Sequence, residues 1–337
     1  MLIELAERAI VPDAALRAGI RRLLRSRLRE LESLGRNPEE DAAAFAEQFA
    51  SGPIAVAADE ANQQHYEVPA ELFVAMLGSR LKYSSCVWPE GVASLDQAEE
   101  AMLRLTCERA GIADGQRVLD LGCGWGSLSL WIAEQYPGCE VTAVSNSRTQ
   151  KAFIDGRAAE RGFENLNVQT TNVAELKLDG PFDRVCSVEM FEHMKNWAAL
   201  LENVDRWLAP DGRFFAHVFC HARRFYPFQA RGKSDWMARH FFTGGVMPPA
   251  DVFQRLAGPL APVEQWEVCG TDYARTCRAW LDKLARNRSA ALAALHGAPN
   301  ARVALQRWRM FLMACEELFA YRGGSEWFVR HALLGRA

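Results

Sequence analysis

The sequence lacks the cysteine patterns of metal sites and disulfide frameworks. It contains nine cysteines among 337 residues, an odd number, and no two of them are spaced as a CxxC pair. Zinc ribbons use paired cysteines at such spacings, and disulfide frameworks normally need an even number. We therefore expect no metal site and no disulfide scaffold, and free thiols fit a cytoplasmic protein in a reducing compartment.

Other features are also missing. No run approaches the roughly 20 apolar residues needed to cross a bilayer. The N-terminus carries Glu4 and Glu7 where a secretory signal would have an apolar core. A formal net charge of -3 gives no basic footprint for nucleic acid. With 49% hydrophobic and 24% charged residues, the chain has the composition of a globular protein with a large core.

The first hundred residues differ from the rest in the periodicity of their apolar residues, which follow helical spacing. We expect residues 1–100 to form an N-terminal helical cap that contributes to the active site. One long helix carries apolar side chains from Leu16 to Leu34, and five arginines share its other face: Arg17, Arg21, Arg22, Arg25 and Arg29. Such a helix can dock on its own domain as a lid, bind a partner or lie on an anionic membrane. We favour the lid, and peripheral membrane contact and a homodimer stay open.

From Gly111 onward, short apolar runs alternate with helical segments. Seven of the runs have the pattern of strands, at residues 117–121, 140–144, 166–170, 184–188, 212–219, 263–269 and 327–333. Strands that alternate with helices indicate a mostly parallel sheet covered on both faces. The sequence thus predicts an α/β fold, with a Rossmann-like domain of seven mostly parallel strands over residues 101–337.

The stretch from 223 to about 250 interrupts this rhythm and is rich in aromatic residues. Four of them, Phe225, Tyr226, Trp236 and Phe241, are candidates for the walls of a substrate pocket beneath a lid. An aromatic ring face stabilises a nearby cation, which suits a substrate or product that carries positive charge. The alternative is that these side chains only pack the underside of the lid.

The strongest local signal is a glycine turn after the first expected strand. The segment at 118–126 reads VLDLGCGWG, and its candidate cofactor-binding residues are Asp120, Gly122, Gly124, Trp125 and Gly126. Glycines let the backbone turn tightly and approach a ligand, and the helix N-terminus that follows favours an anionic or electron-rich group. A dinucleotide turn would follow GxGxxG, but here the third glycine falls one residue early. The GxGxG spacing is typical of S-adenosylmethionine sites.

The next two strands end in polar residues that can complete such a site. No acidic residue follows the strand at 140–144 to hold ribose hydroxyls, and the neutral side chains of Ser145, Asn146 and Gln150 stand near its end instead. They can hydrogen-bond ribose, although they are also ordinary helix-capping residues. After the following strand, Asn172 and Val173 are placed to meet an adenine.

A second constellation, EMFEHMKN, follows the strand at 184–188. Parallel strands open toward a ligand crevice at this end. If the segment turns helical, Glu189, Glu192 and His193 share one face. Two carboxyls beside an imidazole suit proton removal from an amine, because an ammonium has no lone pair to attack a methyl group. The alternative is that Glu192 and His193 form a satisfied polar pair beneath a helix.

Six motifs together carry a resemblance that covers the chain from about His65 to its C-terminus. They are HYEVP at 65–69, LKYSSC at 81–86, LDQAE at 95–99, the glycine turn, AVSNS at 143–147 with Gln150, and FEHMKN at 191–196. The chain resembles the cyclopropane fatty acid synthase superfamily of S-adenosylmethionine methyltransferases, and within it the coclaurine N-methyltransferase branch. The resemblance implies a class I methyltransferase fold and S-adenosylmethionine as the cofactor.

The resemblance also implies roles for particular residues. Tyr83 and Ser84 would reach over the cofactor from the helical cap, and the neutral trio after the second strand would hold the ribose. In the N-methyltransferases, a glutamate and a histidine of the EHMKN segment serve as the base and its orienter. The matching residues here are Glu192 and His193.

The chain departs from its relatives at a bicarbonate site. In the lipid-modifying members, a cysteine, a glutamate, a histidine and a tyrosine hold a bicarbonate ion. The cysteine position is Ser85 here, with Cys86 adjacent, whereas Glu192, His217 and Tyr273 sit where the other three would be. The plant-type N-methyltransferases carry glutamate near the position of His217. The sequence thus mixes two branches, and whether bicarbonate binds stays open.

These features predict an enzyme that N-methylates an amine-bearing, aromatic or cyclic small molecule. Its candidate catalytic residues are Glu189, Glu192, His193, His217 and Tyr273. The first alternative is methyl or methylene transfer to unsaturated lipid acyl chains, which His217 and Tyr273 keep open. The second is a non-catalytic S-adenosylmethionine-binding module, and an intact base beside an intact glycine turn argues against it.

Overall fold

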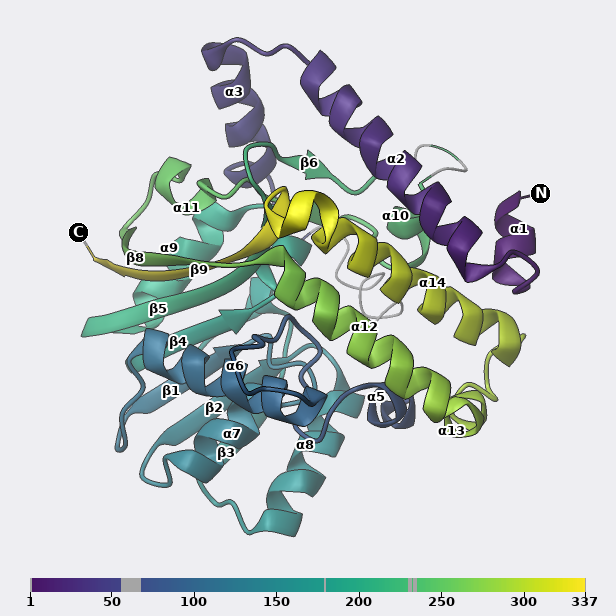
Figure 1. Ribbon diagram of the computed structural model, residues 1–337. Coiled ribbons are helices and arrows are strands. Elements are labelled where there is room, and N and C mark those ends of the chain that lie inside the picture. Colours follow the sequence, from purple (N-terminus) through teal and green to yellow (C-terminus); the bar gives the residue numbers. More distant parts are fainter. Residues whose placement is uncertain (1, 56–67, 179, 230–231, 233–234, 337) are drawn as a thin grey trace.

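A seven-stranded sheet forms the centre of the fold. The computed structural model describes residues 2–55, 68–178, 180–229, 232 and 235–336. The strands of the sheet are β1 (Arg117–Leu121), β2 (Glu140–Ser145), β3 (Leu166–Thr170), β4 (Phe182–Val188), β5 (Leu208–His221), β8 (Leu260–Val268) and β9 (Trp327–Arg336). They lie in the order β3-β2-β1-β4-β5-β9-β8, and among these described strands β9 alone runs antiparallel to its neighbours. The predicted Rossmann-like, mostly parallel sheet is confirmed (Figure 1).

Helices cover both faces of the sheet. They are α6 (Leu95–Ala110), α7 (Ser127–Gln135), α8 (Arg148–Arg161), α9 (Trp197–Trp207) and α11 (Val252–Arg255). Neighbouring residues of a strand point to opposite faces. Val118 and Phe215 therefore pack against α6 and α7, whereas Leu119 and Phe214 pack toward α9 and α11. Burial on both faces explains why these strands read as nearly continuous apolar runs.

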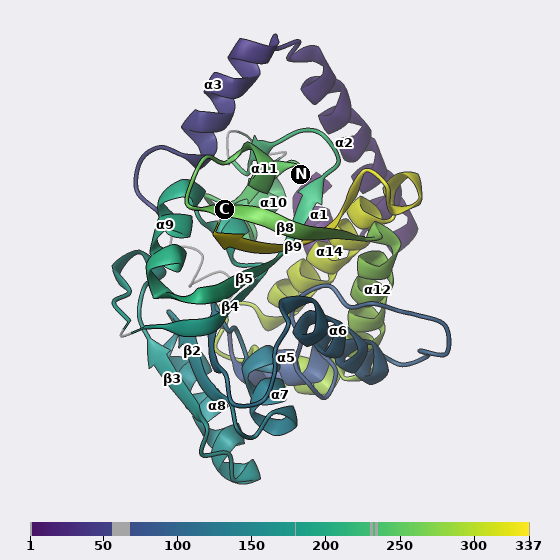
Figure 2. The ribbon, with the colours of Figure 1, turned by 90° about the vertical axis from the view of Figure 1, so that its left-hand side faces the viewer.

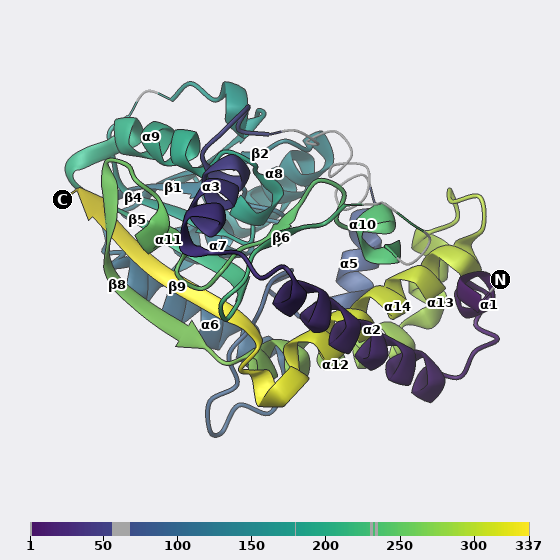
Figure 3. The same ribbon diagram turned by 90° about the horizontal axis from the view of Figure 1, so that it is seen from above.

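A further group of helices brings together segments from the early and the late parts of the sequence. Its members are α1 (Leu2–Glu7), α2 (Asp13–Ser33), α3 (Pro38–Phe49), α5 (Ala70–Met76), α12 (Gly270–Arg286), α13 (Arg288–Ala294) and α14 (Ala301–Phe319). α14 contacts both α2 and α12, and α13 contacts α5 (Figure 3). α12 also contacts α6 (Figure 2), which ties this group to the sheet. Elements from the start and the end of the sequence thus build one helical cover.

The first hundred residues are less helical than predicted. Between α5 and α6, residues 77–94 form an irregular loop, which we call the 77–94 loop. It is held by buried Glu99, whose carboxylate accepts hydrogen bonds from the backbone N–H groups of Gly78 (2.8 Å) and Arg80 (2.9 Å). Helix α6 spans the predicted domain boundary at residue 100. Because the 77–94 loop is held by a buried carboxylate and not by a regular element, apolar spacing in the sequence could not predict its conformation.

Helix α2 is docked on α14. Arg17 forms ion pairs with Glu316 (2.7 Å) and Glu317 (2.9 Å), and Arg21 also pairs with Glu317 (3.0 Å). The other three arginines of the basic face are exposed: Arg22, Arg25 and Arg29. In the part of the chain that the structure describes, no helix is both long and apolar enough to cross a membrane.

Candidate active site

A pocket opens at the carboxyl ends of β1, β2 and β4, beside the 77–94 loop. It encloses about 1120 Å³, including the solvent at its mouth. Most of the predicted cofactor-binding residues line it: Tyr83, Ser84, Gly122, Gly124, Trp125, Ser145, Asn146, Gln150, Asn172 and Val173. The exceptions are Asp120 and Gly126. The pocket therefore lies at the edge of the sheet where a doubly wound fold binds its ligand.

The glycine turn shapes one wall of this pocket through its backbone. Gly122 has a φ of +86°, and a Cβ there would lie 2.5 Å from the side chain of Met190. A Cβ on Gly124, which also has positive φ, would meet nothing within 4 Å. Open space beside Gly124 allows a ligand to approach the backbone itself. Gly126 does not face the pocket, and its Cβ would lie 2.7 Å from Ile154 instead.

Asp120 supports the turn and does not line the pocket. It is buried beneath the loop and accepts a hydrogen bond from the Ser129 hydroxyl (2.5 Å) on α7. Burial raises the pKa of Asp120 to about 6. Its carboxyl group therefore fastens the strand end to the following helix, which corrects its prediction as a direct cofactor ligand.

Unpaired donors around the pocket fit S-adenosylmethionine. Trp125 Nε1, Ser127 Oγ and Gln150 Nε2 are buried, and none has a hydrogen-bond partner among the described residues. The Ser145 hydroxyl donates to Gln150 Oε1 (2.6 Å), which fixes the amide so that its NH2 group remains for a ligand. Buried donors are rarely left unpaired in a protein. These three therefore suit the hydroxyl and carboxylate oxygens of the cofactor.

Asn172 has a smaller part than the sequence indicates. Its side-chain oxygen accepts the backbone N–H of Ala174 (3.0 Å) and begins the short 3-10 helix at Val173–Glu175. Both Asn172 and Val173 line the pocket. Because the amide oxygen already has a donor, a ligand at this wall would share it or meet the rest of the side chain.

The 77–94 loop supplies the wall opposite the glycine turn. Lys82 is buried in it, and its ammonium donates to the Ser84 hydroxyl and to the Ser85 carbonyl (2.8 Å). Burial lowers the pKa of Lys82. The ring of Tyr83 packs edge-on against Phe73, with 5.1 Å between ring centroids. These contacts hold the loop so that the backbone N–H of Ser85 points inward.

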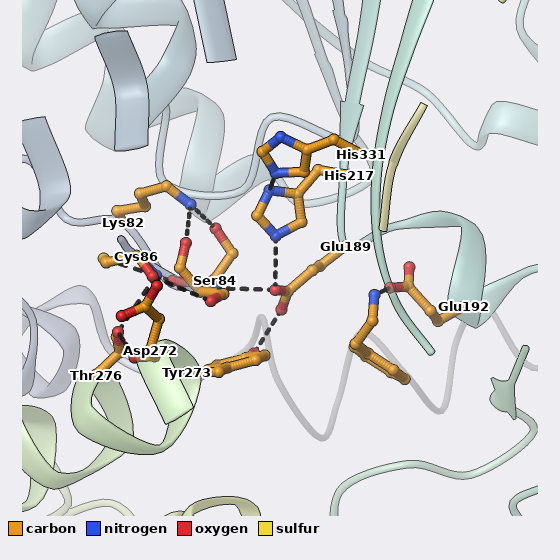
Figure 4. A network of polar contacts seen from close by, with 12 residues as sticks. Lys82, Ser84, Cys86, Glu189, Glu192, His217, Asp272, Tyr273, Thr276 and His331 are labelled. Atoms are coloured by element: carbon orange, nitrogen blue, oxygen red, sulfur yellow. Dashed lines mark hydrogen bonds and ion pairs between the residues drawn. The ribbon is translucent and has the colours of Figure 1, made fainter. Parts of the chain in front are cut away.

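The carboxylate of Glu189 is the centre of the polar network (Figure 4). It lines the pocket directly after β4, in a left-handed backbone conformation with a φ of +48°. Oε1 accepts the Ser85 N–H (2.9 Å) and lies 3.1 Å from His217 Nε2, and Oε2 accepts the Tyr273 hydroxyl (2.6 Å). Burial raises the pKa of Glu189. Strained backbone at a buried carboxylate that faces a pocket is typical of a functional site.

The predicted helical face of Glu189, Glu192 and His193 is wrong. The segment forms only a 3-10 turn over Phe191–His193, and Glu189 lies outside this turn in a left-handed conformation that turns its side chain in another direction. Glu192 is fully buried, accepts the Phe219 N–H (2.7 Å) and lies apart from the Glu189 network (Figure 4). Burial and the neighbouring charge of Glu189 raise its pKa well above the ordinary value. Glu192 is absent from the described pocket lining, whereas His193 belongs to it.

His217 and Tyr273 contact the carboxylate of Glu189 and do not line the pocket themselves. Behind His217 stands His331 of β9, whose Nε2 lies 2.9 Å from His217 Nδ1. Sequence reasoning missed His331, because a single histidine in an apolar strand carries no signal of its own.

Three of the four positions expected around bicarbonate contact Glu189 instead, and the fourth, Glu192, accepts the Phe219 N–H. The Ser85 N–H, His217 and Tyr273 all converge on that one carboxylate. Cys86 does not replace the missing cysteine, since its thiol is buried and its backbone N–H donates to Thr276 Oγ1 (3.3 Å). A carboxylate belonging to the chain thus occupies the set of donors that a bicarbonate ion would require.

The four aromatic candidates for the substrate wall are packed elsewhere. Of the insertion at 223–250, the described elements are β6 (Tyr226–Pro227), α10 (Trp236–His240) and β7 (Val246–Met247). Phe225 packs against Phe45 and Phe49 of α3, and the Tyr226 hydroxyl accepts from the Trp327 indole (3.0 Å).

Trp236 donates to Glu7 (2.8 Å), and Phe241 stacks on Phe311 of α14 with 4.4 Å between ring centroids. All four aromatics are absent from the described lining, so their prediction as pocket walls is wrong. The neighbouring Phe242 is closer to the site, because its ring stacks on the pocket residue His193 at 4.8 Å. A difference of one residue in the sequence thus decides which ring contacts a residue of the pocket wall.

Comparisons with known proteins agree with this geometry. Residues 55–325 match the family model described as mycolic acid cyclopropane synthetase. The chain is 37% identical over 287 residues to (S)-coclaurine N-methyltransferase of Thalictrum flavum subsp. glaucum, which covers 83% of this chain and 80% of that protein. It is also 30% identical over 223 residues to cyclopropane-fatty-acyl-phospholipid synthase of Escherichia coli (strain K12), covering 66% of this chain and 55% of that one.

One solved structure matches almost the whole chain. It is coclaurine N-methyltransferase bound to N-methylheliamine and SAH, with a TM-score of 0.92, 34% sequence identity and coverage of 99% of both chains. The similarity therefore includes the helical cover as well as the sheet. The HYEVP motif at 65–69 lies partly outside the described residues, so its contacts are not part of this agreement.

Proposed function

Since this chain belongs to the mycolic acid cyclopropane synthetase family and is an S-adenosylmethionine-dependent methyltransferase, we propose that it methylates the nitrogen of a small cyclic or aromatic amine. The position of Glu189 carries the proposal, because a buried carboxylate with a raised pKa lines the pocket. An enzyme assignment also removes the hypothesis of a non-catalytic binding module.

The amine must lose a proton for the reaction to occur. An ammonium has no lone pair, and a base of suitable pKa beside it contributes roughly 100- to 10,000-fold to the rate. The contacts of Glu189 support this role, with Oε2 held by Tyr273 and Oε1 held by Ser85 and His217. We assign the base to Glu189 and not to Glu192, whose carboxyl is turned toward Phe219. His193 remains the proposed neighbour of the amine, since it lines the same pocket.

S-adenosylmethionine supplies an electrophilic methyl group on a positively charged sulfur. The backbone at Gly122 and Gly124 and the free donors of Trp125, Ser127 and Gln150 would hold it. Binding both reactants in line makes a bimolecular step effectively unimolecular. This can lower the activation free energy by about 7–11 kcal/mol at best. The task left to this chain is to position the nitrogen and to accept its proton.

Acyl-chain chemistry is the second candidate, and the donor set disfavours it. The similarity to cyclopropane-fatty-acyl-phospholipid synthase keeps lipid transfer in consideration. The resemblance implies that the lipid-modifying members hold a bicarbonate ion, but the Ser85, His217 and Tyr273 donors are already used by Glu189. A carboxylate of the protein itself has a fixed position, which suits an amine substrate whose nitrogen is bound beside it.

A competition assay tests the proposal. The purified enzyme receives methyl-labelled S-adenosylmethionine with coclaurine, other cyclic secondary amines and unsaturated phospholipid vesicles, with and without bicarbonate. We expect label in an amine, no stimulation by bicarbonate, and loss of transfer in the Glu189→Gln variant. Label in the acyl chains, stimulated by bicarbonate, would overturn N-methylation.

One further prediction from the sequence and two of its open alternatives stand as proposals. We propose a cytoplasmic location, and the alternatives to test beside it are a homodimer and peripheral membrane contact through α2. Because Arg17 is engaged by α14, that contact would use the exposed Arg22, Arg25 and Arg29. Cell fractionation, light scattering and sedimentation with anionic vesicles test the three in turn.

A further inference from the structure

We propose that Arg109 and His331 are positioning residues that fix the tautomer of His217 and thereby keep Glu189 a proton acceptor. The inference rests on the proposed role of Glu189 as the base. It concerns four side chains in consecutive contact. The series begins at the pocket with Glu189 and continues through His217 and His331 to Arg109.

The four side chains form one continuous line of contacts. His217 Nε2 lies 3.1 Å from Glu189 Oε1, His331 Nε2 lies 2.9 Å from His217 Nδ1, and Arg109 NH1 lies 2.8 Å from His331 Nδ1. His217 on β5 and His331 on β9 are direct partners in the sheet. Figure 4 shows both imidazoles in line behind Glu189.

Arginine sets the direction of every proton in this line. A guanidinium only donates hydrogen bonds, so His331 Nδ1 must accept one. His331 then carries its proton on Nε2 and donates it to His217 Nδ1. His217 in turn carries its proton on Nε2 and donates it to Glu189 Oε1. Both rings are fully buried, and burial lowers the pKa of each well below the ordinary value, so both stay neutral.

The reverse order of protons is blocked. If Oε1 of Glu189 carried a proton toward His217, both imidazoles would hold their protons on Nδ1. The Nδ1–H of His331 would then face an N–H of Arg109, and two donors cannot bond to each other. Arg109 thus keeps Oε1 as an acceptor and favours the ionised form of Glu189. Without it, the reversed order becomes available and stabilises the protonated carboxyl.

Neighbouring side chains hold Arg109 and His331 in place. The guanidinium lies 5.0 Å from the centre of the Trp266 ring, and Trp266 is the sheet partner of His331 on β8. Phe215 packs edge-on against His331 at 5.1 Å. The charged and titratable groups that face this line are Lys82 from the 77–94 loop, Glu192 from the turn after β4, Tyr273 from α12 and Arg109 from α6.

Substitution of Arg109 tests the inference. Arg109→Met removes the donor and keeps an apolar stem beside Trp266, while Arg109→Lys restores a donor. Arg104→Met is the matched control, because Arg104 is an exposed arginine on the same helix. The first readout is the 15N spectrum of histidine-labelled enzyme with SAH bound, which separates Nδ1–H from Nε2–H tautomers. We expect two buried Nε2–H rings in the wild type and a mixture of tautomers in Arg109→Met.

The second readout is the pH profile of kcat/KM for amine methylation. In Arg109→Met we expect the acidic limb to move upward by about one pH unit, since the reversed hydrogen bonds favour protonated Glu189. KM for S-adenosylmethionine should stay constant, and Arg109→Lys should restore much of the profile. A merely structural role would lower stability without moving this limb.

The outcomes separate this inference from the proposed function. Wild-type tautomers, or an unmoved acidic limb, in a folded Arg109→Met enzyme would overturn the inference even if Glu189→Gln abolished transfer. If Glu189→Gln kept full activity, the proposed base would be wrong, and the role of Arg109 in serving it would fall too. The 15N spectra would still report whether Arg109 orders the two imidazoles.

Discussion

The two sides of the pocket are built in different ways. On the cofactor side, the wall comes from three short stretches near 122–127, 144–150 and 172–173, each at the end of a strand or just after it. On the reaction side, Glu189 gathers partners from positions as far apart in the sequence as Ser85 and Tyr273. The first wall can be recognised from a motif, whereas the second exists only once the sheet has formed.

The two sides also depend on different parts of the residues. The cofactor side relies largely on backbone shape, with left-handed glycines at Gly122 and Gly124, and adds a few side-chain donors that have no partner among the described residues. The reaction side relies on side-chain hydrogen bonds, each with a fixed donor and acceptor. Substitutions on the cofactor side should therefore change binding, and those on the reaction side should change the rate.

The largest effect is expected on the reaction side, from Glu189→Gln. Loss of the base should lower kcat by roughly 100- to 10,000-fold, with little change in the affinity for SAH. Steady-state kinetics and calorimetry measure the two quantities. Glu192→Gln is the matched control, and an equal loss of kcat in it would show that both carboxyls serve the reaction.

A second substitution at the same position sharpens the test. Glu189→Gly accommodates the left-handed backbone and leaves the Ser85, His217 and Tyr273 donors without their carboxylate. Added formate or bicarbonate should then restore part of the rate in this variant alone. Absence of rescue in a folded variant would argue that the attachment of the base to β4 is essential.

A pH-dependent effect is expected at Glu99, which anchors the 77–94 loop of the reaction side. Burial raises its pKa from 4.5 to about 7. The folded state binds this proton more tightly than the unfolded state, so the stabilisation is present below pH 4.5 and is lost as the pH rises to about 7. The loss amounts to roughly 3 kcal/mol at about 1.4 kcal/mol per pH unit.

Urea denaturation between about pH 5 and about pH 8 measures this effect, because it gives the unfolding free energy at each pH. In Glu99→Gln the decline with pH should become shallower, although the variant is less stable overall. An unchanged decline would mean that another group titrates in this range.

On the cofactor side, Gly122→Ala should weaken SAH binding by roughly 10- to 100-fold. Its Cβ would collide with Met190, and left-handed backbone strains a residue other than glycine by about 1–3 kcal/mol. Isothermal calorimetry measures the affinity. Gly156→Ala on α8 is the control, since a Cβ there meets nothing within 4 Å, and it should stabilise the fold by about 0.5–1 kcal/mol. A fall in kcat without a fall in affinity would break the division between the two sides.

The smallest effect is expected in the helical cover that both sides share. Arg17→Ala removes two ion pairs whose side chains are 12–14% exposed and should lower the unfolding free energy by about 1–2 kcal/mol. Arg206→Ala is the control, because its pair with Glu202 is well exposed and contributes about 0.5 kcal/mol or less. Thermal denaturation compares the two, and equal shifts would show that α2 is not fastened through Arg17.

Much of the fold followed from local patterns, and the reaction side did not. The sheet and the cofactor wall could be predicted, because both depend on short contiguous segments. These segments are the buried strands between helices and the strand–glycine–helix turn. Glu189 was a candidate, but helical spacing grouped it with Glu192, because nothing local announces a left-handed residue at a strand end. Phe225 and Phe241 were misassigned because aromatic content does not say which surface a ring will cover.

The docking of α2 on α14 has a consequence for the synthesis of the chain. Helix α2 is synthesised before α14, which carries Glu316 and Glu317, the two glutamates that bind Arg17. Until α14 is made, Leu28 and Leu31, which are buried in the finished protein, have no complete core to enter. The nascent protein must therefore keep α2 undocked until α14 has been synthesised, so the helical cover assembles after the strands β1 to β5 are already made.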